Sequence, residues 1–163
     1  MLLPKQLITR VKKRYTRKNT VMACKDRYIH FLGKTVCGSI HDYQLLKNEL
    51  DVNLGLFDGY KILVDLGYLG MDKAYFSPTI TLPHRKPRQS KLKPETRLSQ
   101  QQQQENKTQA NIRIKVENAL AGVKRLGVVS QVYRNKSLAF NDLVMCLACS
   151  IWNLHLKITN HPI

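Results

Sequence analysis

Acidic residues are scarce in this sequence. Only 11 Asp and Glu stand against 27 Lys and Arg among 163 residues, which gives a formal net charge of +16 and a pI near 10.0. Because such an excess of one sign repels itself in a compact chain, it predicts a polyanionic partner. Nucleic acid is the leading candidate, and an anionic membrane surface is the second.

Long apolar runs are also lacking. The first four residues are followed at once by charge, so no stretch of signal-peptide length is present. The longest apolar run, residues 143–156, is about 14 residues and falls short of the roughly 20 that a membrane span needs. We therefore expect a buried core helix there, a cytoplasmic protein and no membrane contact.

Cysteine is rare, with 4 residues at positions 24, 37, 146 and 149. Without a signal peptide, these are expected to be reduced thiols in the cytoplasm. Cys146 and Cys149 have the spacing of a zinc pair, with His155 and His161 downstream. Both thiols lie within an apolar segment, however, and no second pair has suitable spacing, so we interpret them as core residues.

The basic residues form three clusters, while a hydrophobic content of 43% is sufficient for one folded domain. A solvated basic surface is the simplest explanation for any one cluster, but three clusters on a chain of this size favour nucleic-acid binding. The cations that we single out as DNA contacts are Lys12, Lys13 and Arg14 in the first cluster, Arg85 and Lys86 in the second, and Lys124 and Arg125 in the third.

The pattern of residues predicts an α/β chain. Residues 15–23 and 28–35 are rich in β-branched and aromatic side chains and flank a polar turn at 25–27, which predicts a β-hairpin. Residues 41–47 resemble a helix, capped by Ser39 or Asp42. Residues 60–68 form an apolar run typical of a central buried strand, and a short strand follows at 80–83.

The second half is predicted to be helical. Residues 84–109 are polar and basic, include five consecutive glutamines, and are expected to form a flexible or partly helical insertion. Apolar residues at helical spacing predict a helix over 111–126, which Gly127 would end. A last helix is expected over about 140–156, with Trp152 in the core.

Two acids occupy positions suited to chemistry. Asp65 ends the predicted central strand, where functional groups gather in open α/β sheets, and Glu117 lies on the 111–126 helix. Arg113 and Lys124 fall on the same stripe of that helix as Glu117. Two carboxylates with flanking cations suit a site that holds Mg²⁺ and phosphate. A surface ion pair and a turn-forming Asp fit the same pattern, and spacing alone does not decide between them.

Three ordered motifs carry a family resemblance. Residues 37–43 read Cys-Gly-Ser-Ile-His-Asp-Tyr, residues 64–70 read Val-Asp-Leu-Gly-Tyr-Leu-Gly, and residues 113–119 read Arg-Ile-Lys-Val-Glu-Asn-Ala. Together they resemble the DDE superfamily of insertion-sequence and Harbinger-type transposases over roughly residues 12–156. The family's Tyr-x-x-Arg-x-x-x-Glu-x-x-x-x-x-x-Lys signature is matched at Arg113, Glu117 and Lys124, while Ala110 replaces the Tyr.

The resemblance implies a ribonuclease-H-like fold, with a mixed sheet flanked by helices, as a single partial catalytic domain over residues 1–163. It implies that Asp65 and Glu117 are the second and third catalytic acids and bind Mg²⁺ or Mn²⁺. Arg113 and Lys124 would contact the DNA of the element ends and target, or position the glutamate. Asp42 would cap its helix or, as a weaker alternative, bind metal.

The first catalytic acid of the family lies on a strand upstream of the hairpin. No Asp precedes Asp26, which falls in the predicted turn. We therefore expect this chain alone not to catalyse transposition. An upstream polypeptide would supply the missing strand, or the exposed sheet edge would promote self-association. The alternatives are a non-catalytic basic DNA-binding protein and, from charge and size alone, a small RNA-binding protein.

Overall fold

The computed structural model describes residues 16–75, 80–87, 97–131, 135 and 137–160. Its elements confirm a mixed α/β chain. Among the described residues each strand pairs with one other. β1 (Arg17–Lys18) pairs with β4 (Val36–Cys37) and β2 (Val21–Ala23) with β3 (Ile29–Leu32), both antiparallel, while β5 (Ile62–Leu63) and β6 (Ile80–Thr81) are parallel. The predicted Lys12, Lys13 and Arg14 lie outside the described residues.

The predicted hairpin is confirmed by β2 and β3. Its turn is closed by hydrogen bonds from Cys24 N to Tyr28 O and from Arg27 N to Cys24 O, both 3.0 Å. Arg27 has a φ of 72°, a left-handed conformation that polar turn residues tolerate better than β-branched ones. The register shifts between Met22 and Ala23, so the hairpin contains a bulge close to its turn.

The predicted strand at 60–68 is shorter than expected. Only Ile62–Leu63 pair as β5, and the segment continues into a 3₁₀ helix, η2 (Leu66–Tyr68). Nearby lie α1 (Asp42–Glu49), the 3₁₀ helix η1 (Val52–Leu54) and α2 (Met71–Ala74). These elements enclose one of the two hydrophobic clusters, made of Met22, Leu46, Phe57, Ile62, Val64, Tyr68, Met71 and Ile80.

The helix predicted at 111–126 is the second half of a longer one. α3 (Gln100–Lys124) is 25 residues long and takes in the glutamine run. Ser99 and Gln102 form a capping box at its start, with Ser99 Oγ accepting from Gln102 N and Gln102 Oε1 from Ser99 N. The prediction that Gly127 ends the helix was wrong, because Gly127 is the first residue of α4 (Gly127–Ser130).

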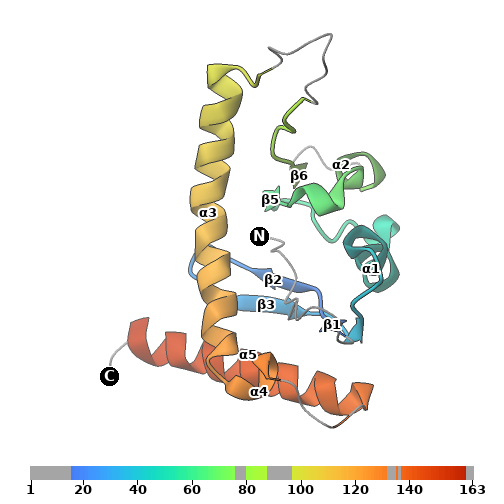
Figure 1. Cartoon of the computed structure of the whole chain (residues 1–163), viewed down its shortest axis with the longest axis vertical. Helices are drawn as coiled ribbons and strands as arrows, with labels where there is room; N and C mark the ends of the chain where they lie inside the picture. The colour runs from blue at the N-terminus through green and yellow to red at the C-terminus, as the bar shows by residue number, and fades with distance from the viewer. Residues whose placement is uncertain (1–15, 76–79, 88–96, 132–134, 136, 161–163) are drawn as a thin grey trace.

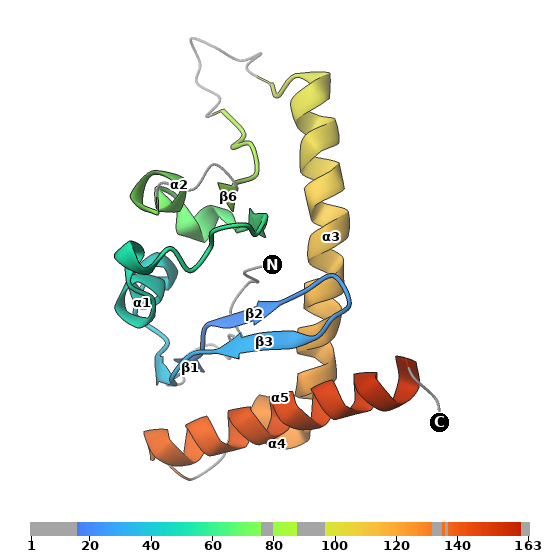
Figure 2. The same ribbon diagram turned by 180° about the vertical axis from the view of Figure 1, so that it is seen from behind.

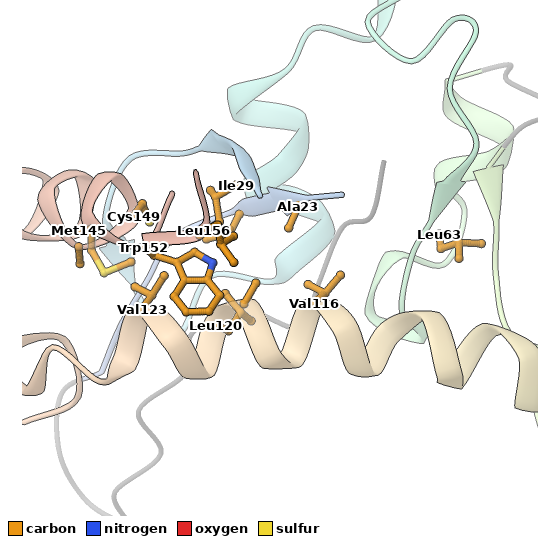
Figure 3. Packing of buried hydrophobic residues seen from close by; sticks show 13 residues of the cluster. Ala23, Ile29, Leu63, Val116, Leu120, Val123, Met145, Cys149, Trp152 and Leu156 are labelled. Carbon is orange, nitrogen blue, oxygen red and sulfur yellow. The ribbon is translucent and has the colours of Figure 1, made fainter. Parts of the chain in front are cut away.

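The last helix, α5 (Leu138–Asn160), crosses the C-terminal end of α3 (Figures 1 and 2). Its inner face builds the second cluster with the hairpin and α3, and Figure 3 shows this cluster following α3 from Trp152 to Leu63. The buried members are Val21, Ala23, Ile29, Leu63, Val116, Ala119, Leu120, Val123, Met145, Ala148, Cys149, Trp152 and Leu156.

The expected buried core helix is confirmed for one face of α5 only. Leu143, Leu147 and Leu154 are 66%, 58% and 56% exposed and lie on the face opposite the core. Cys149 is buried as predicted, whereas Cys146 is exposed. Among the described helices, α5 has the length and apolar composition to cross a membrane, a property that core helices of soluble proteins share.

Gly122 of α3 lies directly against Trp152 of α5. A Cβ on this glycine would overlap the ring of Trp152. Gly122→Ala should therefore destabilise the fold by about 1–3 kcal/mol through overpacking, although Ala normally gains about 1 kcal/mol over Gly in a helix. Urea denaturation measures the change. Trp152→Leu removes the overlap, so Gly122→Ala should be harmless or stabilising in that background; an equal cost in both backgrounds would refute the explanation.

Candidate functional site

Asp65 lies two residues after the last residue of β5, at the end of the buried segment, as the sequence predicted. The three preceding residues, Ile62, Leu63 and Val64, are buried on both sides of the strand. Asp65 is the N-cap of η2, and its Oδ1 accepts a hydrogen bond of 2.8 Å from Leu66 N. This bond fixes the carboxylate at the end of the strand and leaves Oδ2 turned to a second partner.

That second partner comes from α3. Arg113 Nη2 donates to Asp65 Oδ2 at 3.2 Å, and the two side chains are 24% and 25% exposed. A partly buried ion pair is less screened than one on the open surface. The pair therefore fixes the middle of α3 against the end of β5, and joins the second and third sequence motifs in space.

Glu117 lies one helical turn beyond Arg113. Its neighbour Val116 is buried in the same cluster as Leu63 of β5, which places Glu117 beside the Asp65 region. Glu117 itself is exposed, and its carboxylate forms no hydrogen bond or ion pair with the described residues. Asp65 is thus paired with the guanidinium of Arg113, while the carboxylate of Glu117 is available to bind a metal ion.

Asp42 lies near the same site, but not as a helix cap. The N-cap of α1 is His41, with no side-chain capping bond, so the predictions that Ser39 or Asp42 caps this helix were wrong. Asp42 Oδ1 instead accepts from Lys18 Nζ at 2.7 Å. On its other side, a Cβ added to Gly67 of η2 would stand 3.4 Å from Asp42 Oδ2. The first motif therefore packs against the second.

Lys18 is a residue that sequence reasoning did not select. It belongs to a basic cluster, and nothing in its immediate sequence distinguishes it from neighbouring cations. The structure buries it to 4% exposure with Asp42 as its partner. A buried charge is costly unless it is paired, so Lys18 and Asp42 depend on each other.

The candidate acids do not form a closed ligand set. In the described part of the chain, the carboxylate oxygens of Asp42, Asp65 and Glu117 do not all lie within 4.8 Å of one another. Asp65 and Glu117 supply two hard oxygen donors of the kind that Mg²⁺ accepts. The chemistry of these two carboxylates therefore fits a divalent cation, which would need further ligands besides them.

Polar and charged groups follow one line along α3. At about 100° per residue, Asn106, Arg113, Glu117 and Lys124 fall within roughly 40° of one another around the helix. Asn106 holds the segment after β6, accepting from His84 N at 2.8 Å and donating to His84 O at 3.0 Å. His84 also contacts Glu105.

The hydrogen bonds between His84 and Asn106 hold two residues predicted to bind DNA close to α3. Arg85 and Lys86 directly follow His84 and are exposed. At the other end of the line, Lys124 is half-buried and Arg125 is the exposed C-cap of α3. From Asn106 to Lys124 the helix rises about 27 Å, at 1.5 Å per residue. The carboxylates thus lie between cations at both ends.

A family model described as DDE superfamily endonuclease matches residues 6–153 of the chain. The match includes all three motifs and most of the chain. No curated protein and no solved structure matches the chain.

Proposed function

Because the chain belongs to the DDE superfamily endonuclease family, we propose that it is part of the catalytic domain of a DNA transposase of an insertion sequence. The observation that carries the proposal is the ion pair between Arg113 and Asp65, which brings two family motifs together. In this proposal Asp65 and Glu117 are the second and third catalytic acids. The enzyme would work in the cytoplasm, on DNA of the nucleoid.

A ribonuclease-H-like sheet is supported by the fact that strands β2 and β5 both contribute side chains to each of the two hydrophobic clusters. Val21 and Ala23 of β2 lie in the cluster with Leu63 of β5, whereas Met22 lies in the cluster with Ile62. Because successive residues of a strand point to opposite faces, β2 and β5 contribute to the same two layers. We propose that both belong to one sheet.

The proposed sheet offers pairing positions for a further strand. In the described residues β2 pairs only with β3, and β5 only with β6, and β2 is the strand of the hairpin nearer to β5 in Figures 1 and 2. A strand between β2 and β5 would satisfy the edges of both. We propose that this strand brings the first catalytic acid, supplied by an upstream polypeptide or by self-association.

The chain's own groups would have distinct tasks. Family enzymes generally use divalent metal ions, and we propose that Asp65 and Glu117 hold Mg²⁺ or Mn²⁺. Such an ion supplies a Lewis acid that activates water and stabilises charge at the phosphodiester. Arg113 orients Asp65 through its ion pair, while Lys124, Arg125, Arg85 and Lys86 bind the DNA backbone. Asp42, already paired with Lys18, holds the η2 turn in place, and a direct metal role for it remains the weaker proposal.

Nicking of supercoiled plasmid carrying the element ends tests this function. The 163 residues alone should not nick the DNA. They supply only two of the three catalytic acids, and two acids without the third bind the metal poorly. Fusion to a segment that supplies the strand and its Asp should give nicking that needs Mg²⁺ or Mn²⁺ and stops with EDTA. Activity from a mixture of separate polypeptides would identify the upstream polypeptide as the source of the strand. Metal-independent nicking, or none after fusion, would contradict the proposal.

A non-catalytic DNA-binding protein is the second candidate. The net charge of +16 favours it, since that charge supports binding whether or not the acids act. It predicts DNA binding that does not depend on metal or on Glu117. Clear preference for RNA over duplex DNA would instead favour a small RNA-binding protein.

A further inference from the structure

The turn of the β2–β3 hairpin gathers three side chains that bind metals. Cys24 follows β2, Asp26 lies in the turn and His30 is on β3. One donor atom from each, a thiol sulfur, a carboxylate oxygen and a ring nitrogen, lies within 4.8 Å of the other two. We propose that these residues form a zinc site, separate from the acids on β5 and α3.

The kind of ion follows from the donors. Sulfur and imidazole nitrogen suit Zn²⁺ and similar transition metals, whereas Mg²⁺ takes oxygen ligands. In a tetrahedral site with Zn–S near 2.3 Å and Zn–N and Zn–O near 2.0–2.2 Å, the ligand atoms stand about 3.3–3.6 Å apart. The present spacing, within 4.8 Å, exceeds these distances by at most about 1.5 Å, which two exposed side chains and the half-buried Cys24 can close. Three protein ligands leave the fourth position to water.

The backbone that carries these ligands is held in place. Asn153 of α5 accepts from Ile29 N at 2.9 Å and donates to Ile29 O at 2.8 Å. Trp152 Nε1 donates to Arg27 O at 3.0 Å. With the two hydrogen bonds that close the turn, these contacts fix both sides of the site before any ion binds. Preorganised ligands lose less conformational entropy on binding.

The side chains themselves are partly oriented. Asp26 Oδ1 accepts from Tyr28 N at 3.1 Å, which leaves Oδ2 for an ion. The Tyr28 ring lies beside that of His30, with centroids 5.3 Å apart. Burial raises the pKa of the Cys24 thiol, so a metal ion must displace its proton on binding. The bound ion would join the ends of β2 and β3 across the turn of the hairpin.

Cobalt titration of the whole chain tests the site. Co²⁺ replaces Zn²⁺ in such sites and gives a thiolate charge-transfer absorption together with strong visible bands for four-coordination. After chelator treatment, the wild-type chain should gain both signals with one equivalent of Co²⁺, and Zn²⁺ should abolish them. Cys24→Ser should remove the charge-transfer band, and His30→Ala should weaken or remove both signals.

Two other exposed cysteines provide matched controls. Cys37→Ser and Cys146→Ser change exposed thiols on β4 and α5 and should leave the signals intact. Circular dichroism verifies that each variant is folded. A charge-transfer band that survives Cys24→Ser, or no band in the wild-type chain, would overturn the zinc site. The spectrum should not change in Glu117→Gln, so this result is independent of the proposed transposase activity.

Discussion

Glu117→Gln should lower metal-dependent nicking by the fused, three-acid protein on the order of a thousandfold. The change removes one negative charge and one metal ligand but keeps the size of the side chain. Metal ions contribute several kcal/mol to stabilising charge in the transition state, and about 1.4 kcal/mol corresponds to a factor of ten in rate. Because Glu117 is exposed and has no bonding partner among the described residues, its replacement should not disturb the fold.

Glu105→Gln provides a closely matched control. Glu105 is the other acid of α3, so the same change is made on the same helix. Its partners are His84 and Gln101, and an amide can still hydrogen-bond to both. Initial rates of nicking at saturating Mg²⁺ compare the two variants, and DNA binding is measured in parallel. Equal rates for Glu117→Gln and wild type would refute the catalytic assignment, whereas loss of binding in Glu117→Gln would point to a structural cause.

Local sequence patterns predicted some elements well. The hairpin was predictable because a polar turn separates two runs of β-branched and aromatic residues, and the turn closes at Arg27 as the pattern indicates. The face of α3 was predictable from the spacing of Val116, Leu120 and Val123, which are buried together. Both signals are contained in a few consecutive residues, so they do not depend on the rest of the fold.

Other features depend on contacts that are distant in sequence. The glutamine run has no apolar periodicity, yet glutamine has good helix propensity and Ser99 caps the helix, so α3 begins at Gln100. The apolar composition of α5 predicted a core helix, but only one of its faces is buried among the described residues. The pairing of Lys18 with Asp42 joins residues 24 positions apart, and no local pattern indicates it.

The candidate site shows the same division. The spacing placed Arg113, Glu117 and Lys124 on one stripe of a helix. From this pattern and the family resemblance, Arg113 was predicted to contact either Glu117 or DNA. The structure pairs it with Asp65 instead, across 48 positions of sequence. This contact could not be inferred from periodicity, because periodicity describes one helix at a time. It changes the proposed role of Arg113 from binding phosphate to orienting the carboxylate at the end of β5.

Binding to duplex DNA should weaken by about 10³–10⁵ between 50 and 200 mM salt, as expected for 6–10 phosphate contacts. The 27 Lys and Arg supply cations for such a number of contacts. Each neutralised phosphate contributes about 0.9 to the magnitude of the slope of log K against log salt. Filter binding or fluorescence anisotropy at several salt concentrations measures that slope. A slope near zero would show that the net charge of +16 is not used to bind DNA.

Single substitutions locate the contacts. Lys86 is exposed on the segment that Asn106 fastens to α3, whereas Lys157 is exposed near the end of α5, which crosses the opposite end of that helix. Lys86→Ala should reduce the magnitude of the salt slope by about 1, for one lost phosphate contact. Lys157→Ala removes the same charge and should leave the slope unchanged. Equal losses from both would mean that DNA responds only to the total charge of the chain. A loss confined to Lys86 would place the DNA along α3, where it passes Arg113 and Glu117.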